Sequence, residues 1–335
     1  MKMKVSVVIP AKNAEETIGY LLHSLMYQTI KPHEIIVIDD GSTDNTGDIA
    51  RRFRNVKVIV NRESKGANFS RNLGILESTG DIIAFTDSDC EVDVRWIENI
   101  SKLFKECDVS AISGAVYSGN IDKFLSRFLE QSIISPAPKY NKDVILKGDL
   151  NPFVIVTTAN FAIRKSIIEK VGLFDPEYRH YGSDDMDYAY RILRSGFKIL
   201  CTSKVKVKHY HRVRLSKVIK RYFQYGQGFA IFKIKNPQSI FSRLVSYSFL
   251  GLIILLISPV IYYLMGSLLK VPVPKVLVYL PLLPLLVVSA YHLLGLIKVK
   301  NIERILYIPL DLLIIVSSLL GFLYMYIKLK MGKKL

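Results

Sequence analysis

Three long apolar stretches near the end of the chain constrain its fold more than any other feature. They cover residues 244–266, 276–297 and 305–327. A helix that crosses a lipid bilayer needs about 20 consecutive apolar residues, so each stretch is long enough to span a membrane. A soluble core seldom uses three such stretches in series. We therefore interpret residues 244–335 as a membrane domain of two to three helices rather than as buried core helices.

The charged residues divide the chain into two unlike parts. Residues 188–335 contain 23 of the 46 basic residues but only two of the 29 acidic ones, Glu303 and Asp311. Clustered basic charge attracts either nucleic acid or anionic lipid. The apolar stretches in the same part of the chain favour lipid. We therefore expect a lipid membrane as a partner, and no nucleic acid.

The N-terminal part has the character of a cytosolic domain. The apolar run in "MKMKVSVVIP" is too short for a signal peptide. The three cysteines have no CxxC spacing, which argues against a disulfide framework or a zinc site. We expect a multi-pass protein of the cell membrane whose N-terminal domain lies in the cytosol. The side on which the C-terminus lies stays open, because one apolar stretch can be interfacial or re-entrant.

Short β-branched runs alternate with helical patterns over about the first 110 residues. The predicted strands are 4–10, 34–39, 56–61 and 81–87, and the predicted helices are 14–28, 48–53 and 65–79. Alternation at these lengths predicts βαβ units, and therefore an α/β fold with a mostly parallel sheet covered on both faces. Further on, 109–119 and 153–163 are candidate strands. Residues 183–197 predict a helix, with Ser183 as its N-cap and Gly196 just beyond its end.

Polar side chains follow three of the predicted strands. They are Lys12 and Asn13 after the first strand, Asp39 and Asp40 after the second, and Asp87 and Asp89 after the fourth. In a doubly wound sheet, ligands bind beyond the carboxyl ends of the strands. Alternate residues of an extended chain share a side, so Asp87 and Asp89 can face one ligand. Carboxylates in this arrangement suit Mg²⁺ or Mn²⁺, although each segment alone is also an ordinary charged turn.

Seven segments occur in an order that carries more information than any one of them. They are "VSVVIPAKN", "IIVIDDGSTDNT", "KGANFSRNLGI", "GDIIAFTDSDC", "TANFAIRKS", "VGLFDPEYRHYGSDDMDYAYRILRSGFKI" and "VKHYHR". This ordered set resembles the inverting family 2 glycosyltransferases with the GT-A fold, and the resemblance covers about residues 4–211. It implies a Rossmann-like catalytic domain that binds a nucleotide-sugar donor.

The resemblance also implies roles for individual residues on the donor side. The nucleotide-sugar site would comprise Pro10, Ala11, Lys12, Asn13, Asp39, Asp40, Arg71, Asp87 and Ser88. Asp39 would contact the base, Asp87 the ribose, and Arg71 would lie near the nucleotide. Asp89 would bind the divalent metal, Mg²⁺ or Mn²⁺, that holds the diphosphate.

On the acceptor side, the family's paired acidic motif is here Asp184–Asp185. The resemblance makes Asp185 the catalytic base, with Asp184 and Asn160 on the acceptor side. Inversion needs one base that takes the proton of the attacking hydroxyl, and the metal stabilises the departing diphosphate. His209 is the expected second metal ligand, and His211 is its rival.

These features together predict a membrane-anchored inverting glycosyltransferase. It would move one sugar from a UDP- or GDP-sugar to a hydroxyl of a lipid-linked or glycan acceptor at the cytosolic face. A polyprenyl- or dolichyl-phosphate sugar synthase is the close alternative, and a non-catalytic nucleotide-binding scaffold is an alternative of another class. The oligomeric state stays open.

The expected domains are a GT-A domain over 1–210, a basic juxtamembrane segment over 211–243 and a membrane domain over 244–335. The basic run 203–235 has two interpretations. It either binds anionic lipid, or forms a lid over the diphosphate through Arg212 or Arg214.

Overall fold

The chain is organised as two compact units. The computed structural model describes residues 3–179, 182–211, 213–268, 270 and 274–332. The first unit comprises residues 1–130 and 136–213, and the second comprises residues 131–135 and 214–334. The expected end of the first domain was residue 210. The short segment Gln131–Ser135, inside that expected domain, packs with the second unit.

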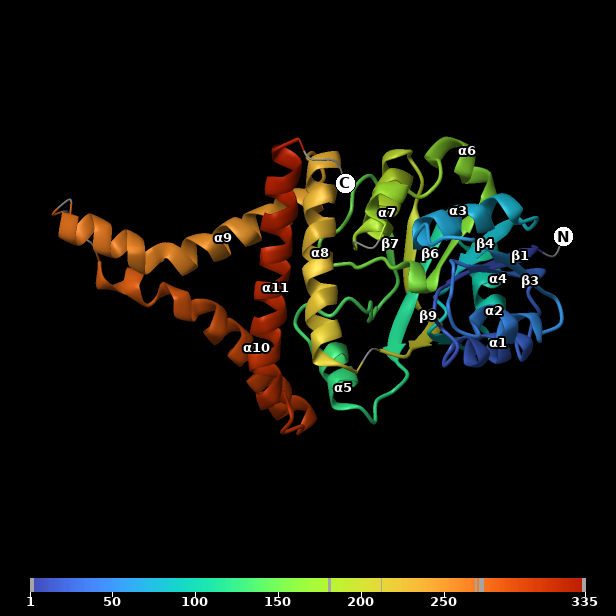
Figure 1. Ribbon diagram of the computed structural model, residues 1–335, viewed down its shortest axis with the longest axis horizontal. Coiled ribbons are helices and arrows are strands. Elements are labelled where there is room, and N and C mark those ends of the chain that lie inside the picture. Colours follow the sequence, from blue (N-terminus) through green and yellow to red (C-terminus); the bar gives the residue numbers. More distant parts are fainter. Residues whose placement is uncertain (1–2, 180–181, 212, 269, 271–273, 333–335) are drawn as a thin grey trace. The chain divides into compact units, whose positions relative to one another are not determined.

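The first unit alternates strands and helices as the sequence pattern predicts (Figure 1). Its elements are β1 (Val5–Ala11), α1 (Ile18–Met26), β2 (Glu34–Asp39), α2 (Thr46–Arg51), β3 (Val56–Val60), α3 (Ala67–Glu77), β4 (Ile82–Phe85), β5 (Cys90–Val92), α4 (Trp96–Glu106), β6 (Ala111–Ser118), α5 (Phe124–Gln131), β7 (Val144–Leu146), β8 (Phe161–Arg164), α6 (Ile168–Val171), α7 (Asp184–Arg194) and β9 (Ile199–His209). The last residue of α5, Gln131, already belongs to the second unit.

Within the described residues, nine strands form one mixed sheet. The order is β3-β2-β1-β4-β8-β6-β9-β5, and β7 pairs with β9. Strands β1 to β4 are parallel, as predicted, because each of their connections is a helical crossover. β8 is antiparallel to both β4 and β6, whereas β9 runs parallel to β6. The carboxyl ends of β1, β2, β4, β6 and β9 therefore lie at one edge of the sheet.

Helices cover both faces of this sheet. The odd-numbered residues of β1, such as Val7, join Leu21 of α1 and Ile100 of α4 in one buried core. The even-numbered Val8 points the opposite way and meets α3 at Gly74, where a Cβ atom would lie 2.3 Å from a Val8 methyl carbon. The two-residue period of the strand thus supplies an apolar surface to each layer.

Two local predictions differ from the structure. Of the candidate strand 153–163, only its end, in β8, forms a strand; Thr158–Asn160 is a turn of 3₁₀ helix. Ser183 does precede α7, but its φ is +70° and its side chain makes no capping hydrogen bond with the described residues. Gly196, with a φ of +86°, ends this helix as expected.

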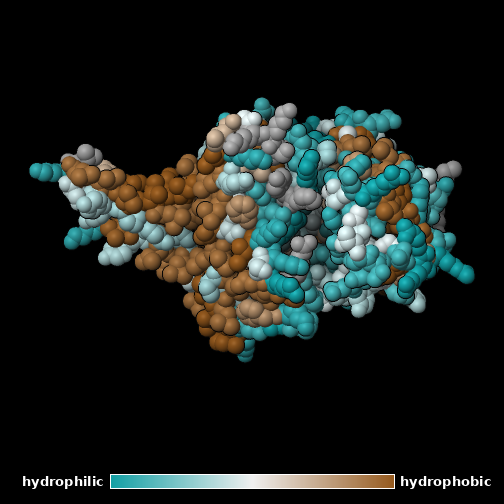
Figure 2. All heavy atoms as spheres, in the orientation of Figure 1, coloured by the Kyte–Doolittle hydropathy of each residue, from teal (hydrophilic) through white to brown (hydrophobic). Residues whose placement is uncertain are grey.

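The second unit consists mainly of four helices in the described range (Figure 1). They are α8 (Leu215–Lys235), α9 (Ile240–Tyr263), α10 (Leu283–Val299) and α11 (Arg304–Lys330). Among the described residues, three helical segments are long and apolar enough to cross a membrane: Ile240–Leu268, Leu280–Val299 and Arg304–Lys330. They correspond to the three predicted stretches. Figure 2 shows the hydrophobic surface that the side chains of these segments form.

Helices α8 and α11 lie side by side and approach closely (Figure 1). A Cβ atom on Gly226 would lie 1.9 Å from the carbonyl oxygen of Ser318, and one on Gly321 would lie 2.0 Å from that of Phe223. The Ser317 hydroxyl also donates to the carbonyl oxygen of Ile219 at 2.9 Å. Small residues at a helix crossing allow such backbone approach, and this contact explains why α11 is the most buried of the three candidate spans.

A buried polar cluster fastens the segment Gln131–Ser135 to this unit. Asp311 of α11 and His292 of α10 are fully buried, with His292 Nε2 2.7 Å from Asp311 Oδ2. The Ser132 hydroxyl and the Ile133 N–H both donate to the Asp311 carboxylate. A buried carboxylate is tolerated only when it is hydrogen-bonded in this way. Asp311, one of the two acidic residues in the basic part of the chain, is thus bound by these neighbours in a structural role.

Candidate active site

The loops that follow β1 and β2 are joined by hydrogen bonds at the carboxyl edge of the sheet. Asn13, with a φ of +48°, accepts at its side-chain oxygen from the N–H of Thr43 at 2.9 Å. Its own N–H donates to the Ser42 hydroxyl, also at 2.9 Å. The expected donor-side residue Asn13 is therefore part of the scaffold that shapes this edge. Lys12 beside it is exposed, whereas Pro10 and Ala11 are buried as the last residues of β1.

Asp39 is the last residue of β2, and its side chain is buried. One of its carboxylate oxygens accepts from the Ser42 N–H at 3.0 Å. The other lies close to Gly47 at the start of α2, where a Cβ atom would approach to 2.6 Å. Glycine at position 47 thus makes room for the carboxylate. The predicted contact of Asp39 with the nucleotide base stays a prediction.

Asp40 has a role that the sequence did not reveal. Its side chain is buried, and its carboxylate accepts four hydrogen bonds from the segment between β3 and α3. The donors are Asn61 Nδ2 at 2.9 Å, Ser64 Oγ at 2.7 Å, the Lys65 N–H at 2.9 Å and the Gly66 N–H at 2.9 Å. Burial acts to raise the pKa of Asp40, but these hydrogen bonds outweigh it and the net pKa is lowered. Asp40 therefore holds this loop in place.

Arg71 joins the two acidic motifs, which are nearly one hundred residues apart in the sequence. Its side chain is 6% exposed; Nη2 lies 3.0 Å from Asp87 Oδ1, and Nη1 lies 3.0 Å from Asp184 Oδ2. Nη1 also donates to the side chain of Asn68. One guanidinium thus places the end of β4 beside the start of α7. Arg71 was expected near the nucleotide, and its bridge between these carboxylates was not predicted from the sequence.

The acidic first turn of α7 contains residues with different surroundings. Asp187 is buried, and its carboxylate accepts from Arg191 Nε at 2.9 Å and from the Tyr178 hydroxyl at 3.3 Å. Asp184 binds Arg71, as described. Asp185 is partly exposed, and its carboxylate accepts from the N–H of Met186 at 2.8 Å. The predicted base therefore lies next to a residue that Arg71 connects to Asp87.

Asp89 and His209 meet at the end of the sheet. The antiparallel pairing of β5 with β9 sets Cys90 opposite His209, and His209 Nε2 lies 3.3 Å from Asp89 Oδ1. Both side chains are partly exposed, at 33% for Asp89 and 22% for His209. A carboxylate oxygen and an imidazole nitrogen that converge on one accessible point fit a divalent cation. The sequence placed these two residues in one metal site, and the fold brings them together.

Cys90 belongs to the same group, since its sulfur, Asp89 and His209 offer atoms within 4.8 Å of one another. Burial, followed by the negative charges of Asp89 and Asp87, raises the pKa of the Cys90 thiol well above its ordinary value. A metal-binding cysteine acts as a thiolate. The buried thiol therefore suits a packing role, and the accessible carboxylate–imidazole pair suits the cation.

His211 lies beside His209 but does not face Asp89. The two Nδ1 atoms are 3.1 Å apart, and the ring centroids are 4.6 Å apart. Burial, and next the ring of His209, lower the pKa of His211 to about 3, so this imidazole is neutral at neutral pH. Of the two candidate ligands, His209 is the one whose ring nitrogen lies 3.3 Å from Asp89.

Two further expected residues differ in how accessible they are, and a third lies outside the described range. Asn160 is buried; it accepts from Trp96 Nε1 and donates to the carbonyl oxygens of Ala115 and Val205. These bonds occupy its amide, so its predicted acceptor contact lacks support here. Ser88, between Asp87 and Asp89, is partly exposed. Arg212 lies outside the described residues.

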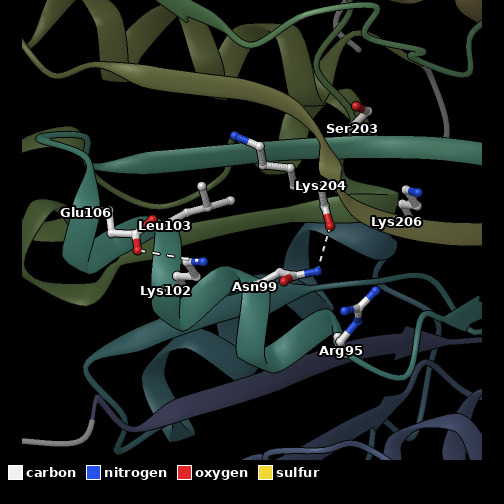
Figure 3. A pocket seen from close by; sticks show the side chains of 8 residues that line it. All are labelled: Arg95, Asn99, Lys102, Leu103, Glu106, Ser203, Lys204 and Lys206. Carbon is white, nitrogen blue, oxygen red and sulfur yellow. Dashed lines mark hydrogen bonds and ion pairs between the residues drawn. The ribbon is translucent and has the colours of Figure 1, made fainter.

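A surface groove of the first unit is separate from these residues. It has a volume of about 380 Å³ and is lined by α4 and by the bulged part of β9, including Arg95, Lys204 and Lys206 (Figure 3). The Asn99 side chain donates to the carbonyl oxygen of Lys204 across it. This part of β9 lies between the segments that pair with β7 and with β5, and the Asp93 N–H donates to the carbonyl oxygen of Lys206 at 3.1 Å. The groove contains none of the expected site residues.

Comparison with known proteins identifies the family and the fold of this chain. Residues 6–172 match the family described as "Glycosyl transferase family 2". The chain belongs to this family. Two relatives of this family 2 glycosyltransferase are the glycosyltransferase AglE of Haloferax volcanii, 29% identical over 235 residues, and the glucosyltransferase WfaP of Escherichia coli, 29% identical over 216 residues. The matches cover 67% and 64% of this chain, and 72% and 79% of the relatives.

The fold of this family 2 glycosyltransferase is shared with a solved mannosyltransferase. The structure of PcManGT from Pyrobaculum calidifontis, in complex with GDP-Man and Mn²⁺, superposes with a TM-score of 0.60 at 17% identity, over 97% of this chain and 88% of that one. The GT-A-like α/β domain followed by apolar helices is therefore confirmed. Larger relatives contain more than this chain does, because it spans only 23% and 32% of two chondroitin synthases that it also matches.

Proposed function

We propose that this family 2 glycosyltransferase is membrane-anchored and inverting. It transfers a single sugar from a UDP- or GDP-sugar to a hydroxyl of a lipid-linked or glycan acceptor at the cytosolic face. The observation that carries the proposal is the pairing of Asp89 with His209 at 3.3 Å, at the edge where β1, β2 and β4 end. The apolar helices supply the anchor, and WfaP, whose name specifies a diphosphoundecaprenol-linked acceptor, supports the acceptor class.

Asp89 and His209 would hold Mn²⁺ or Mg²⁺, which would neutralise charge on the donor's diphosphate as it leaves. The solved structure of PcManGT, which has this fold, contains Mn²⁺. Asp39 would bind the base and Asp87 the ribose. Arg71 would hold Asp87 in place, because its guanidinium lies 3.0 Å from that carboxylate.

Asp185 would accept the proton of the attacking hydroxyl. It lies in the first turn of α7, next to Asp184, which Arg71 connects to the donor side. A hydroxyl acceptor needs such a base, whereas a polyprenyl phosphate is already ionised. The acidic pair therefore favours a hydroxyl acceptor over the synthase alternative.

The test is donor turnover in the purified full-length chain with Mn²⁺ and a panel of UDP- and GDP-sugars. We expect Asp185→Asn to lower turnover by about 10²- to 10⁴-fold while nucleotide affinity stays within a few-fold. Asp184→Asn is the matched neighbouring control and should lose less. Unchanged turnover in Asp185→Asn would refute the base assignment. Efficient transfer to dolichyl phosphate alone would overturn the hydroxyl acceptor in favour of the synthase.

A further inference from the structure

At the end of β9, the imidazole of His209 lies in the candidate metal site and the imidazole of His211 lies against it. His209 contacts Asp89 through Nε2 and His211 through Nδ1, so both of its ring nitrogens are engaged. His211 does not reach Asp89. Its Nε2 is buried and has no hydrogen-bond partner among the described residues. The role of His211 toward His209 that we derive from these contacts rests on the proposed function.

The proton inventory of the two rings limits the possible arrangements. A neutral imidazole carries a hydrogen on one ring nitrogen and a lone pair on the other. A hydrogen bond between the two Nδ1 atoms therefore needs a hydrogen on one and a lone pair on the other. For His209 to offer the Nε2 lone pair to a cation, its hydrogen must be on Nδ1. His211 Nδ1 must then be the acceptor, and the His211 hydrogen lies on Nε2.

We propose that His211 is a positioning residue that accepts the hydrogen bond from His209 Nδ1–H and thereby directs the Nε2 lone pair of His209 toward Asp89. Metal-bound histidines commonly donate their second ring nitrogen to a neighbouring acceptor, which selects the tautomer and orients the ring. In most proteins the acceptor is a carboxylate, a carbonyl or water. Here a second histidine occupies that place.

The backbone of His211 is itself held firmly. Asn120, which follows β6, accepts from the His211 N–H at 3.1 Å and donates to the His211 carbonyl oxygen at 2.9 Å. The Ser126 hydroxyl donates to the same Asn120 side-chain oxygen at 2.7 Å. The Asn120 amide thus binds both the N–H and the carbonyl oxygen of His211. The His211 ring therefore has a defined position from which to orient His209. The neighbouring Tyr210 N–H donates to the Asp89 carbonyl oxygen at 2.8 Å, which ties the same segment to the metal motif.

The test measures binding of Mn²⁺ alone to the full-length chain, from the electron paramagnetic resonance signal of the free ion. We expect His211→Ala to weaken Mn²⁺ binding by about 10- to 100-fold, the usual effect of removing such a partner. His211→Asn should recover most of the affinity, because its Oδ1 lies near the position of the lost Nδ1. Both substitutions remove most of the ring, so a packing defect alone would affect them similarly.

Two further variants separate this inference from the metal site itself. Asp89→Asn and His209→Ala should each abolish or strongly weaken Mn²⁺ binding. If neither does, the proposed metal site is wrong. If both do but His211→Ala binds Mn²⁺ like the unmodified chain, or His211→Asn is no better than His211→Ala, the positioning role is refuted. Fluorescence of Trp96, the only tryptophan, reports whether each variant is folded.

Discussion

Replacing Asp40 by asparagine is expected to destabilise the first unit strongly, although it changes one oxygen to an NH₂ group. The carboxylate accepts two hydrogen bonds at each oxygen, and each oxygen serves one backbone N–H: Lys65 at Oδ1 and Gly66 at Oδ2. Whichever way the new amide turns, its NH₂ faces one of these N–H groups. The chain then loses at least one hydrogen bond to a backbone donor, and the others lose their charged acceptor.

The magnitude follows from these contacts. A buried donor left without a partner costs about 1–3 kcal/mol, and a hydrogen bond to a charged group contributes about 1.5–3 kcal/mol. Ser64 and Asn61 can reorient toward the new amide, which limits the loss to about 3 kcal/mol. For a domain of this size, that corresponds to a decrease of about 6–12 °C in the unfolding midpoint, at about 2–4 °C per kcal/mol.

The assay is thermal unfolding of the full-length chain followed by tryptophan fluorescence. Trp96 is the only tryptophan and is fully buried in the first unit, so the signal reports on that unit. Asp48→Asn is the matched control, because the Asp48 side chain is 69% exposed and, among the described residues, pairs with Arg51, which is itself 53% exposed. We expect it to change stability by less than about 0.5 kcal/mol. Equal midpoints for Asp40→Asn and Asp48→Asn would refute the reasoning.

The same carboxylate predicts a pH dependence. The pKa of Asp40 is lowered in the folded chain, so its stabilising contribution is fully present above the unfolded-state pKa of about 3.9 and is lost as the pH falls through the lower folded value. The difference in midpoint between the unmodified chain and Asp40→Asn should therefore be constant near neutral pH and shrink below about pH 4. A difference that grows on acidification would contradict the assignment.

Three further substitutions test the packing and the charge bridge. Gly74→Ala should destabilise the first unit by about 1–3 kcal/mol, since its Cβ would lie 2.3 Å from Val8, and Trp96 fluorescence will show the shift. Arg71→Met leaves Asp87 and Asp184 without their shared cation and should lower stability by about 1–3 kcal/mol, a loss limited because both carboxylates are partly exposed. It should also weaken nucleotide binding in a titration. Gly226→Leu should separate α8 from α11 and reduce the monodisperse fraction in size-exclusion chromatography. Gly251→Leu is the control, because a Cβ atom at Gly251 would meet no described atom within 4 Å, and it should leave that fraction unchanged.

Some parts of the site were predictable because they depend on local pattern. Asp39 and Asp87 follow buried strands, and parallel strands bring their carboxyl ends to one edge, so the alternation of strands and helices was enough to group them. His209 was placed in the site from the resemblance, and the structure sets its Nε2 3.3 Å from Asp89 Oδ1. The acidic turn of α7 was visible from the run of aspartates.

Other contacts depend on long-range packing that no local pattern reports. Asp40 looks like a second binding aspartate in "VIDDGS", but the fold surrounds it with donors from a loop more than twenty residues later. Arg71 lies on a helix in an ordinary polar segment, and only the packing of α7 beside β4 makes it a bridge. Asn160 likewise appeared available for a ligand, yet Trp96 and two backbone carbonyls occupy it.

The sequence by itself determined the α/β order of the first unit, the three apolar helices and the family. Each of these depends on periodicity, on the length of an apolar run or on the order of short motifs, all of which are local. Only the tertiary structure decided which residues meet. The β9 strand returns beside β5, which brings His209 to Asp89 and places His211 behind it. That arrangement requires strands distant in the chain to pair in one register, and no short segment specifies it.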